Sequence, residues 1–468
     1  MGTIDVDSVP FDGYESLIEA DTRQEILSVA QSLKGLRVVH ANATPTGGGV
    51  AEILRSLVPM MRGLGIDASW WALEADDGFF TVTKRLHNGL QGKGTSLCRK
   101  DIECYWLHNE RAASAIETAF GFADILVAHD PQVMAVPAFL RDGTRSVWHC
   151  HIDLTAPAKD VQARLLPLTQ YYARCLVSMP EYAAVGLPPE RTVAFPPAID
   201  PFTAKNRHLP LSEARARLAA LGIDCQRPLV TQVSRFDPWK DPWGVVDAYR
   251  LAKRRVPDLQ LALVGALTAK DDPEGGEVWR SVRSYASDEP DIHIYHQPEV
   301  GGDETTVNAF QTASNVVVQK SVREGFGLTV TEAMWKGKPV VGGDCGGIRL
   351  QIEDGVNGYL VNNAVECAER IVDLLDDPQR ARAMGAAARE SVRRRFLMPR
   401  LLLDYLRLFQ QIVHGQLCQP ERCRDSEAKA LAAMLAVLPD SEAAEHGQRT
   451  PRSRGKVRRS KRAPARVA

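Results

Sequence analysis

The sequence lacks the features that mark membrane-spanning, secreted and zinc-binding proteins. No apolar run reaches the roughly 18 residues that a membrane span needs, and the N-terminal stretch has neither the basic nor the apolar segment of a secretion signal. The nine cysteines are scattered and form no matched pair of Cys-x-x-Cys motifs, which favours reduced thiols. We therefore expect a cytoplasmic protein with no membrane span.

Net charge is also nearly absent, but the charges are unevenly distributed. The chain has 57 Lys and Arg against 58 Asp and Glu, whereas residues 449–466 contain nine basic residues and no acidic one. Such a tail can bind nucleic acid or an anionic surface. Because no aromatic side chain for base stacking is interleaved, we expect a disordered, solvated tail that does not bind nucleic acid.

The length and the composition indicate a globular chain with more than one domain. At 468 residues the chain is too long for one typical hydrophobic core. Its content of 44% hydrophobic and 25% charged residues is ordinary for a folded protein. We expect two domains of roughly 200 residues each. Two such domains commonly enclose a cleft.

The first half of the chain alternates apolar strands with glycine turns and helices. The strand at 36–43 is followed by "TPTGGGVAEILRSLVPMMRGLG", which supplies a turn, a helix and a glycine stop. This order predicts a parallel, doubly wound sheet. Further strands are expected at 66–73, 124–130, 145–152, 174–179 and 191–199.

A proline-rich segment near residue 200 separates this pattern from a second one of the same kind. There, Asp241 is expected to cap a helix that has Pro242 at its first position. Strands are expected at 228–236, 259–265, 291–296, 315–321, 338–344 and 358–361. The predicted fold class is therefore α/β, with two Rossmann-like domains facing across a cleft. In such domains ligands bind at the carboxyl ends of the strands.

These patterns divide the chain into five parts. We expect an N-terminal leader with one helix, a first Rossmann-like domain, a second Rossmann-like domain, an amphipathic helix that crosses between them, and an extension with one more helix before the basic tail. Their respective ranges are 1–34, 35–198, 199–395, 396–415 and 416–468.

Charged side chains follow the expected strands of the second domain. Arg235 ends one strand, Lys240 follows it, and Glu324 follows another. The glycine turn at 325–327 precedes a helix, whose first backbone N–H groups and dipole favour an anion. Together these features predict a diphosphate site, and the glycine triplet at 47–49 offers the same chemistry from the opposite wall.

Several motifs carry a family resemblance. The stretch "REGFGLTVTEA" resembles the E-x7-E pattern of retaining GT-B glycosyltransferases of the glycogen-synthase-like family four, and "SRFDPWKD" resembles their Arg and Lys donor-phosphate motif. With "GDCGGI" and "EDGVNGYLV", the resemblance spans roughly residues 35–415. Within that family, "HANATPTGGGVAEIL", "HDPQ" and "WHCHIDLT" are similar to trehalose glycosyltransferring synthases and to the related retaining trehalose phosphorylases.

The resemblance implies a role for each matching residue. Arg235 and Lys240 would neutralise the leaving diphosphate, Glu324 would accept hydrogen bonds from the transferred sugar, and His151 would face that sugar. The first domain would bind the acceptor and the second the nucleotide sugar. The implied donor-binding residues are Gly48, Gly265, Gly325, Phe326, Gly327, Leu328, Thr329 and Glu332, the last of which would hold the ribose.

The histidines and neighbouring polar residues of the first domain have alternative interpretations. Asp130, Gln132 and Asp153 are expected in loops on one side, where they would bind the acceptor. His151 could instead be a half-buried structural histidine. His149 and His151 share a strand face and could bind a metal as a pair, but no third ligand is evident in the sequence. We therefore expect no metal cofactor, with Mg²⁺ at most an assisting ion.

The resemblance implies transfer of glucose from a nucleoside-diphosphate glucose to glucose, reversibly forming trehalose. The compact length favours a synthase over a phosphorylase. A phosphorylase and a family-four hexosyltransferase with another acceptor stay open, whereas the intact set of charged residues disfavours a non-enzymatic binding module. The partners would be small sugars and nucleotide sugars, with a homodimer also open. The nucleotide base, expected to be contacted near residues 297–300, is not decided.

Overall fold

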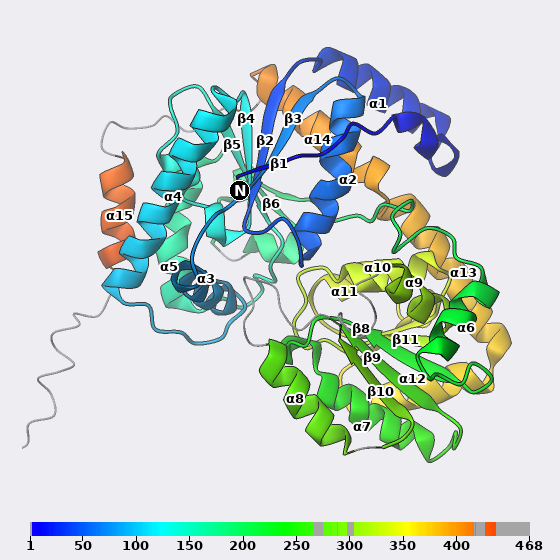
Figure 1. The fold of residues 1–468 in the computed structure, drawn as a ribbon. Coiled ribbons are helices and arrows are strands. Elements are labelled where there is room, and N and C mark those ends of the chain that lie inside the picture. The colour runs from blue at the N-terminus through cyan, green and yellow to red at the C-terminus, as the bar shows by residue number, and fades with distance from the viewer. Residues whose placement is uncertain are drawn as a thin grey trace, which may run out of the picture.

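The computed structural model describes residues 2–184, 186–265, 275–287, 289–296, 304–415, 417 and 426–436, to which all structural statements refer. The segment at 297–300, expected near the nucleotide base, and the basic tail lie outside the described residues. Figure 1 shows two α/β domains, each with a sheet between helices, and a C-terminal helix that returns to the first domain. This confirms the predicted fold class.

The first domain contains a seven-stranded sheet in the order β1-β3-β2-β4-β5-β6-β7. All neighbours pair in parallel except β1 and β3, which are antiparallel. The two-residue β1 belongs to the segment expected to be a separate leader, so that segment completes the edge of the sheet instead. The strands are β1 (Thr3–Ile4), β2 (Arg37–Asn42), β3 (Asp67–Ala72), β4 (Ile125–His129), β5 (Arg145–Cys150), β6 (Arg174–Val177) and β7 (Thr192–Ala194).

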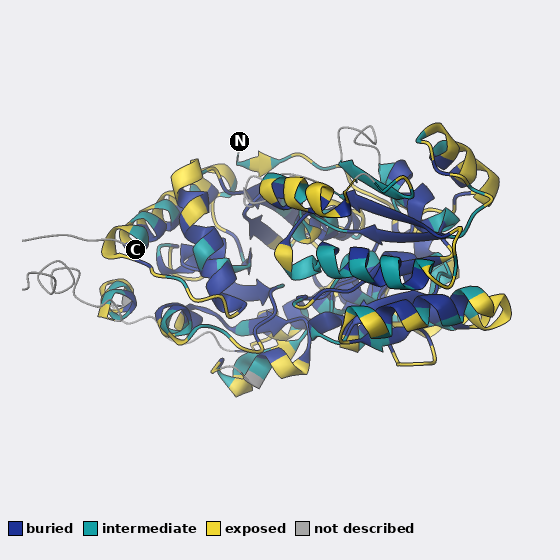
Figure 2. Ribbon diagram, turned by 90° about the horizontal axis from the view of Figure 1, so that it is seen from below, coloured by how far each residue is buried: buried dark blue, intermediate teal, exposed yellow. Residues whose placement is uncertain are grey.

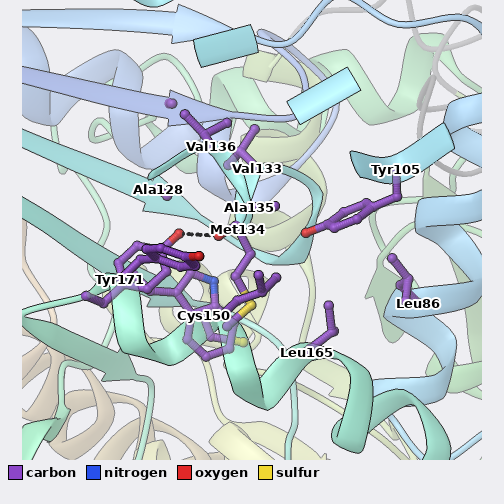
Figure 3. Packing of buried hydrophobic residues seen from close by; sticks show 14 of the residues in the cluster. Leu86, Tyr105, Ala128, Val133, Met134, Ala135, Val136, Cys150, Leu165 and Tyr171 are labelled. Atoms are coloured by element: carbon purple, nitrogen blue, oxygen red, sulfur yellow. Dashed lines mark hydrogen bonds between the residues drawn. The ribbon is translucent and has the colours of Figure 1, made fainter. Parts of the chain in front are cut away.

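Helices cover both faces of this sheet and form two cores. Figure 3 shows part of the core on one face, where Leu86, Tyr105, Cys150 and Leu165 come from α3, α4, β5 and α5. The other face is covered by α1, α2 and a helix from the end of the chain. The helices of this domain are α1 (Ala20–Ser32), α2 (Gly49–Gly63), α3 (Asp77–Leu90), α4 (Arg99–Phe120) and α5 (Lys159–Leu165).

The second domain contains a six-stranded, fully parallel sheet in the order β10-β9-β8-β11-β12-β13. Apart from the half-buried edge strand β10, its strands consist mostly of buried residues, because helices cover both faces. In the view of Figure 2 the strands are mostly buried and the helices expose their outer sides. The strands are β8 (Leu229–Val233), β9 (Gln260–Gly265), β10 (Ile292–His296), β11 (Val316–Gln319), β12 (Val340–Gly343) and β13 (Tyr359–Val361).

The helices of the second domain follow its strands in βαβ order. The predicted cap is confirmed, because the Asp241 side chain accepts a hydrogen bond from Gly244 N at 3.1 Å and Pro242 is the first helical residue. The helices are α6 (Leu211–Ala220), α7 (Pro242–Lys253), α8 (Gly275–Ala286), α9 (Glu304–Ala313), α10 (Leu328–Trp335), α11 (Gly346–Gln351), α12 (Ala364–Asp376) and α13 (Pro378–Arg395).

The last two described helices pack on the first domain. α14 (Met398–Val413) is the predicted amphipathic crossover helix, and it buries its apolar side in the core beside α1 and α2. α15 (Ser426–Ala436) lies against α4 and α5 on the opposite side of the sheet. No helix within the described ranges has the length and apolarity that crossing a membrane requires.

Candidate active site

A cavity of about 570 Å³ lies between the two domains. The first domain lines it with the residues after β2, the start of α2, part of α3 and the ends of β4 and β5. The second domain contributes the loops after β8 and β11 and the start of α10. Both sheets therefore direct the carboxyl ends of their strands into one cavity, as expected for ligand sites in open parallel sheets.

The N-termini of two helices face each other across this cavity. α10 begins after Gly327, whose φ of 89° is a left-handed conformation that favours glycine. α2 begins at Gly49, and a β-carbon built there would lie 3.0 Å from Leu328 Cδ1. The predicted donor-binding residues of both turns, Gly48 and 325–329, all line the cavity. The unpaired N–H groups of both helices are thus available to an anion.

A cationic corner lies beside the α10 turn. Lys240 ends the short 3-10 helix Pro238–Lys240, and its Nζ lies 2.6 Å from Glu324 Oε2. Ser321 Oγ donates a hydrogen bond to the same carboxylate oxygen at 3.1 Å. Arg235 also lines the cavity, as does Gly265 at the end of β9. The structure therefore brings Arg235, Lys240 and Glu324 together, as the strand-end argument predicted.

Asp237 compensates part of this positive charge. It is buried, and its Oδ2 atom lies 3.6 Å from Arg235 Nη2. Burial raises the pKa of its carboxyl, but Lys240 and Arg235 more than offset that effect, so the pKa lies below its ordinary value. Asp237 is therefore ionised and holds the cationic loop in place.

The loop that carries Glu324 is held by the first domain. Tyr182 Oη donates a hydrogen bond to the carbonyl oxygen of Glu324 at 2.8 Å. Gly325 approaches the His151 backbone so closely that a β-carbon would lie 3.0 Å from the His151 carbonyl carbon and overlap its oxygen. The wall of the cavity beside Glu324 is thus assembled from both domains in direct contact.

Glu332 lines the cavity and is 1% exposed. Its carboxylate lies 3.6 Å from Lys205 Nζ, which also lies 2.6 Å from Glu52 Oε1. Gln311 Nε2 donates a hydrogen bond to Glu332 Oε2 at 3.3 Å. Burial raises the pKa of Glu332, and the charge of Lys205 opposes that rise. Lys205, in the linker between the domains, was missed from the sequence.

The predicted acceptor residues divide into two groups. Asp130 and Gln132 line the cavity with His151, and the His151 backbone N–H donates to Asp130 Oδ1 at 2.7 Å. Asp153 does not line the cavity and is 1% exposed. Its carboxylate instead accepts a hydrogen bond from Thr155 and lies 3.6 Å from Arg323 Nη1. The structure thus places Asp153 beneath Arg323, which does reach the cavity.

Sequence reasoning also missed the contribution of α3. Lys84, His87 and Gln91 line the cavity from the first domain, on the side of Arg235. Lys84, Arg235 and above all burial lower the pKa of His87, which is therefore neutral at pH 7. The available signal was a set of polar residues at helical spacing (84, 87, 88 and 91) within an otherwise amphipathic helix.

A third imidazole joins the histidine pair of the sequence. Nitrogen atoms of His129, His149 and His151, one per residue, all lie within 4.8 Å of one another. This third imidazole was not evident from the sequence, because His129 ends the neighbouring strand β4 and pairs in register with His149. Parallel pairing brings together residues that are twenty positions apart.

Comparison with known proteins identifies the family. Residues 40–184 match the family described as "Trehalose synthase, N-terminal domain", and residues 215–391 match "Glycosyl transferases group 1". The chain is 44% identical to a trehalose synthase of Rubrobacter xylanophilus over 86% of this chain and 96% of that protein. It is 40% identical to a trehalose synthase of Pyrococcus horikoshii over 85% and 95%, respectively.

The chain belongs to the trehalose synthase family. Among solved structures, a sucrose-phosphate synthase from Thermosynechococcus elongatus aligns with a TM-score of 0.64, covering 81% of this chain and 100% of that chain at 20% identity. That likeness concerns the fold, which is GT-B. The trehalose synthase family membership makes the chain a glycosyltransferase of trehalose-related chemistry, with the cavity between its domains as the candidate active site.

Proposed function

We propose that this trehalose synthase family member transfers glucose from a nucleoside-diphosphate glucose to glucose, with retention of configuration, and that the reaction is reversible. The observation that carries the proposal is the pairing of Lys240 with Glu324 beside the α10 N-terminus, in a cavity shared by both domains. This arrangement offers positive charge for a diphosphate next to a carboxylate for sugar hydroxyls. A binding protein whose ligand carries no phosphate would need neither the positive charge nor the neighbouring carboxylate.

The proposed step separates charge along the cavity. The bond between the anomeric carbon and the diphosphate oxygen breaks, while a hydroxyl of the acceptor glucose forms the new bond on the same face. The hydroxyl proton passes to the leaving diphosphate, as the family resemblance implies. Arg235, Lys240 and the α10 N–H groups stabilise the departing negative charge. Glu324 holds hydroxyls of a glucosyl group that becomes oxocarbenium-like.

Other residues would position the two sugars and the nucleotide. We assign Glu332 to the ribose, which requires it to exchange part of its contact with Lys205 for the ligand. His151, Asp130 and Gln132 would face the glucosyl and acceptor hydroxyls, because they line the opposite wall. Asp153 is assigned a supporting role through Arg323.

A donor and acceptor panel tests the proposal. Trehalose formation is measured from glucose with ADP-, GDP- or UDP-glucose, and in parallel with glucose 1-phosphate. We expect trehalose and a nucleoside diphosphate, and NMR should show an α-configured product bond. Trehalose formed only from glucose 1-phosphate, with release of phosphate, would identify a phosphorylase instead. Glucose 6-phosphate as the sole effective acceptor would reassign the acceptor.

Two substitutions test the site itself. Lys240→Met removes the charge and keeps the stem, and Glu324→Gln keeps the shape. Lys240→Met removes an interaction with the developing negative charge of the diphosphate, and Glu324→Gln weakens the contact with the transferred glucosyl group. We therefore expect kcat to fall by about 100-fold or more in each variant. Lys34→Met, which replaces an exposed lysine between α1 and β2, serves as the matched control and should be as active as the wild type. Full activity of both site variants would contradict the assignment.

A further inference from the structure

Four histidines lie on one face of the first sheet, near the carboxyl ends of its central strands. His129 of β4 pairs in register with His149 of β5, and His151 follows two positions on. His40 lies on the adjacent strand β2, in register with Val127. Residues in register, and residues two apart on one strand, share a face of a sheet. All four rings are therefore adjacent, beneath α14.

The nitrogen atoms of these rings are unevenly satisfied. His40 Nδ1 and His129 Nε2 lie 3.0 Å apart, and His129 Nδ1 and His151 Nε2 also lie 3.0 Å apart. His149 Nδ1 lies 2.5 Å from Tyr405 Oη of α14. His149 Nε2, like His40 Nε2, is buried and has no hydrogen-bond partner among the described residues. A buried, unpartnered nitrogen in a native protein needs an explanation.

We propose that His129, His149 and His151 form a binding site for a divalent transition-metal ion, for which Zn²⁺ is the best fit. A tetrahedral zinc ion with Zn–N bonds of about 2.0–2.1 Å holds its nitrogen ligands about 3.3 Å apart. One nitrogen from each ring already lies within 4.8 Å of the other two. His129 and His151 line the cavity, so the fourth position is open to water or to a sugar oxygen.

Two of the three rings, His129 and His149, have outer hydrogen-bond partners of the kind that metal-bound histidines have. If His129 binds through Nδ1, its Nε2–H donates to His40 Nδ1. If His149 binds through Nε2, its Nδ1–H donates to Tyr405 Oη. Such outer hydrogen bonds fix ring orientation in metal sites.

This site would couple metal binding to the transfer reaction. The ion would engage His151, the residue that the proposed function places beside the glucosyl group. It would therefore exclude the sugar and act as a reversible inhibitor. The metal site itself does not depend on the proposed function, because ion binding can be measured without any sugar.

Metal binding by the full-length chain tests the site directly. Zn²⁺ affinity is measured by competition with a chromophoric chelator, and Co²⁺ is used as a spectroscopic probe. We expect one ion per chain and the intense visible absorption of four-coordinate Co²⁺. His149→Phe should weaken Zn²⁺ binding at least 100-fold, because it removes a ligand. Tyr405→Phe, which removes only an outer hydrogen bond, should weaken it about 10-fold.

A matched control and a folding check complete the experiment. His414→Gln removes an exposed histidine just after α14 and should leave the affinity unchanged. Thermal unfolding in EDTA shows whether each variant folds. If His149→Phe does not fold, the Zn²⁺ affinity of Tyr405→Phe decides the test. A six-coordinate Co²⁺ spectrum, or wild-type affinity in the variants that fold, would overturn the proposal. The contact between His129 Nδ1 and His151 Nε2 would then be only an N–H···N hydrogen bond between the two rings.

Discussion

At the scale of single residues, the surroundings of Glu332 contain several buried or partly buried charged groups. Lys336 directly follows α10, one turn after Glu332, and its Nζ lies 3.3 Å from Asn206 Oδ1. Burial lowers the pKa of Lys336 to about 7, with a further lowering from Lys205 and an opposing effect from Glu332. A lysine that loses its proton near neutral pH makes stability depend on pH.

We predict that Lys336→Met stabilises the protein at pH 6.5 and that this advantage shrinks as the pH rises. Below about pH 7 the lysine is charged in both states, so the full cost of burying its charge is present. Between about 7 and its ordinary value near 10.5, only the unfolded state keeps the proton, and wild-type stability rises with pH. Chemical unfolding of both proteins at pH 6.5, 8 and 9.5 measures the difference. A pH-independent difference, or the same trend in exposed Lys34→Met, would contradict this cause.

Most of the candidate site residues could be predicted because of where they stand relative to strands. Arg235, Lys240 and Glu324 follow strands of one parallel sheet, whose carboxyl ends meet at one edge, so proximity follows from the pattern. Lys205 could not be predicted in this way, because its partners Glu52 and Glu332 belong to different domains. Asp153 was predicted to line the cavity, but it points toward Arg323 instead. The turn that directs it there has no recognisable pattern of hydrophobic residues in the sequence.

At the scale of elements, long periodic segments were predictable and short or mixed ones were not. The strands from β2 onward fall within the expected ranges, and most of them are the buried apolar runs that parallel sheets contain. β1 has two residues, which is too few to show any period, and it exists only because β3 offers an edge. The role of α3 was missed because the helix contributes apolar residues to a core and polar residues to the cavity.

The loop between β11 and α10 gives a prediction at this scale. We expect Gly325→Ala to lower kcat/KM by about 100-fold, since an added methyl group would overlap the His151 carbonyl oxygen and push the two walls apart. Gly325 has no positive φ, so the effect is steric. Steady-state kinetics measure it. Gly276→Ala in α8, where a β-carbon meets nothing within 4 Å, is the control. Equal activity of the two variants would show that the domains do not need this contact.

At the scale of the whole molecule, the chain ties its two domains together repeatedly. α14 leaves the second domain and fills the core of the first, and Ile199 bridges to Leu397 where the chain crosses. Arg55 of α2 lies 3.4 Å from Glu304 of α9, and Arg323 reaches Thr155 at 2.8 Å. The crossover helix was predicted from its amphipathic pattern, whereas the ionic contacts depend on the relative placement of domains and have no sequence signal.

α15 extends this arrangement beyond the crossover helix. Ala430 and Met434 are buried in the core formed with α4 and α5. Arg164 of α5 donates a hydrogen bond to the Met434 carbonyl at 3.1 Å. α5 in turn contacts α3, which lines the cavity. The C-terminal helix therefore supports the cavity wall from behind, although it contributes no residue to it.

This support distinguishes α15 from the basic tail that follows it. We predict that ending the chain after residue 436 leaves thermal stability and kcat/KM unchanged, whereas ending it after residue 415 lowers Tm. The second truncation uncovers the apolar surface that Met434 and Ala430 bury, and burying a methionine is worth about 1.5–3 kcal/mol. Met434→Ala in the full chain should reproduce part of the loss. Equal Tm values for the two truncations would mean that α15 contributes no stability, and a loss of activity on removing the tail alone would give that segment a role in catalysis.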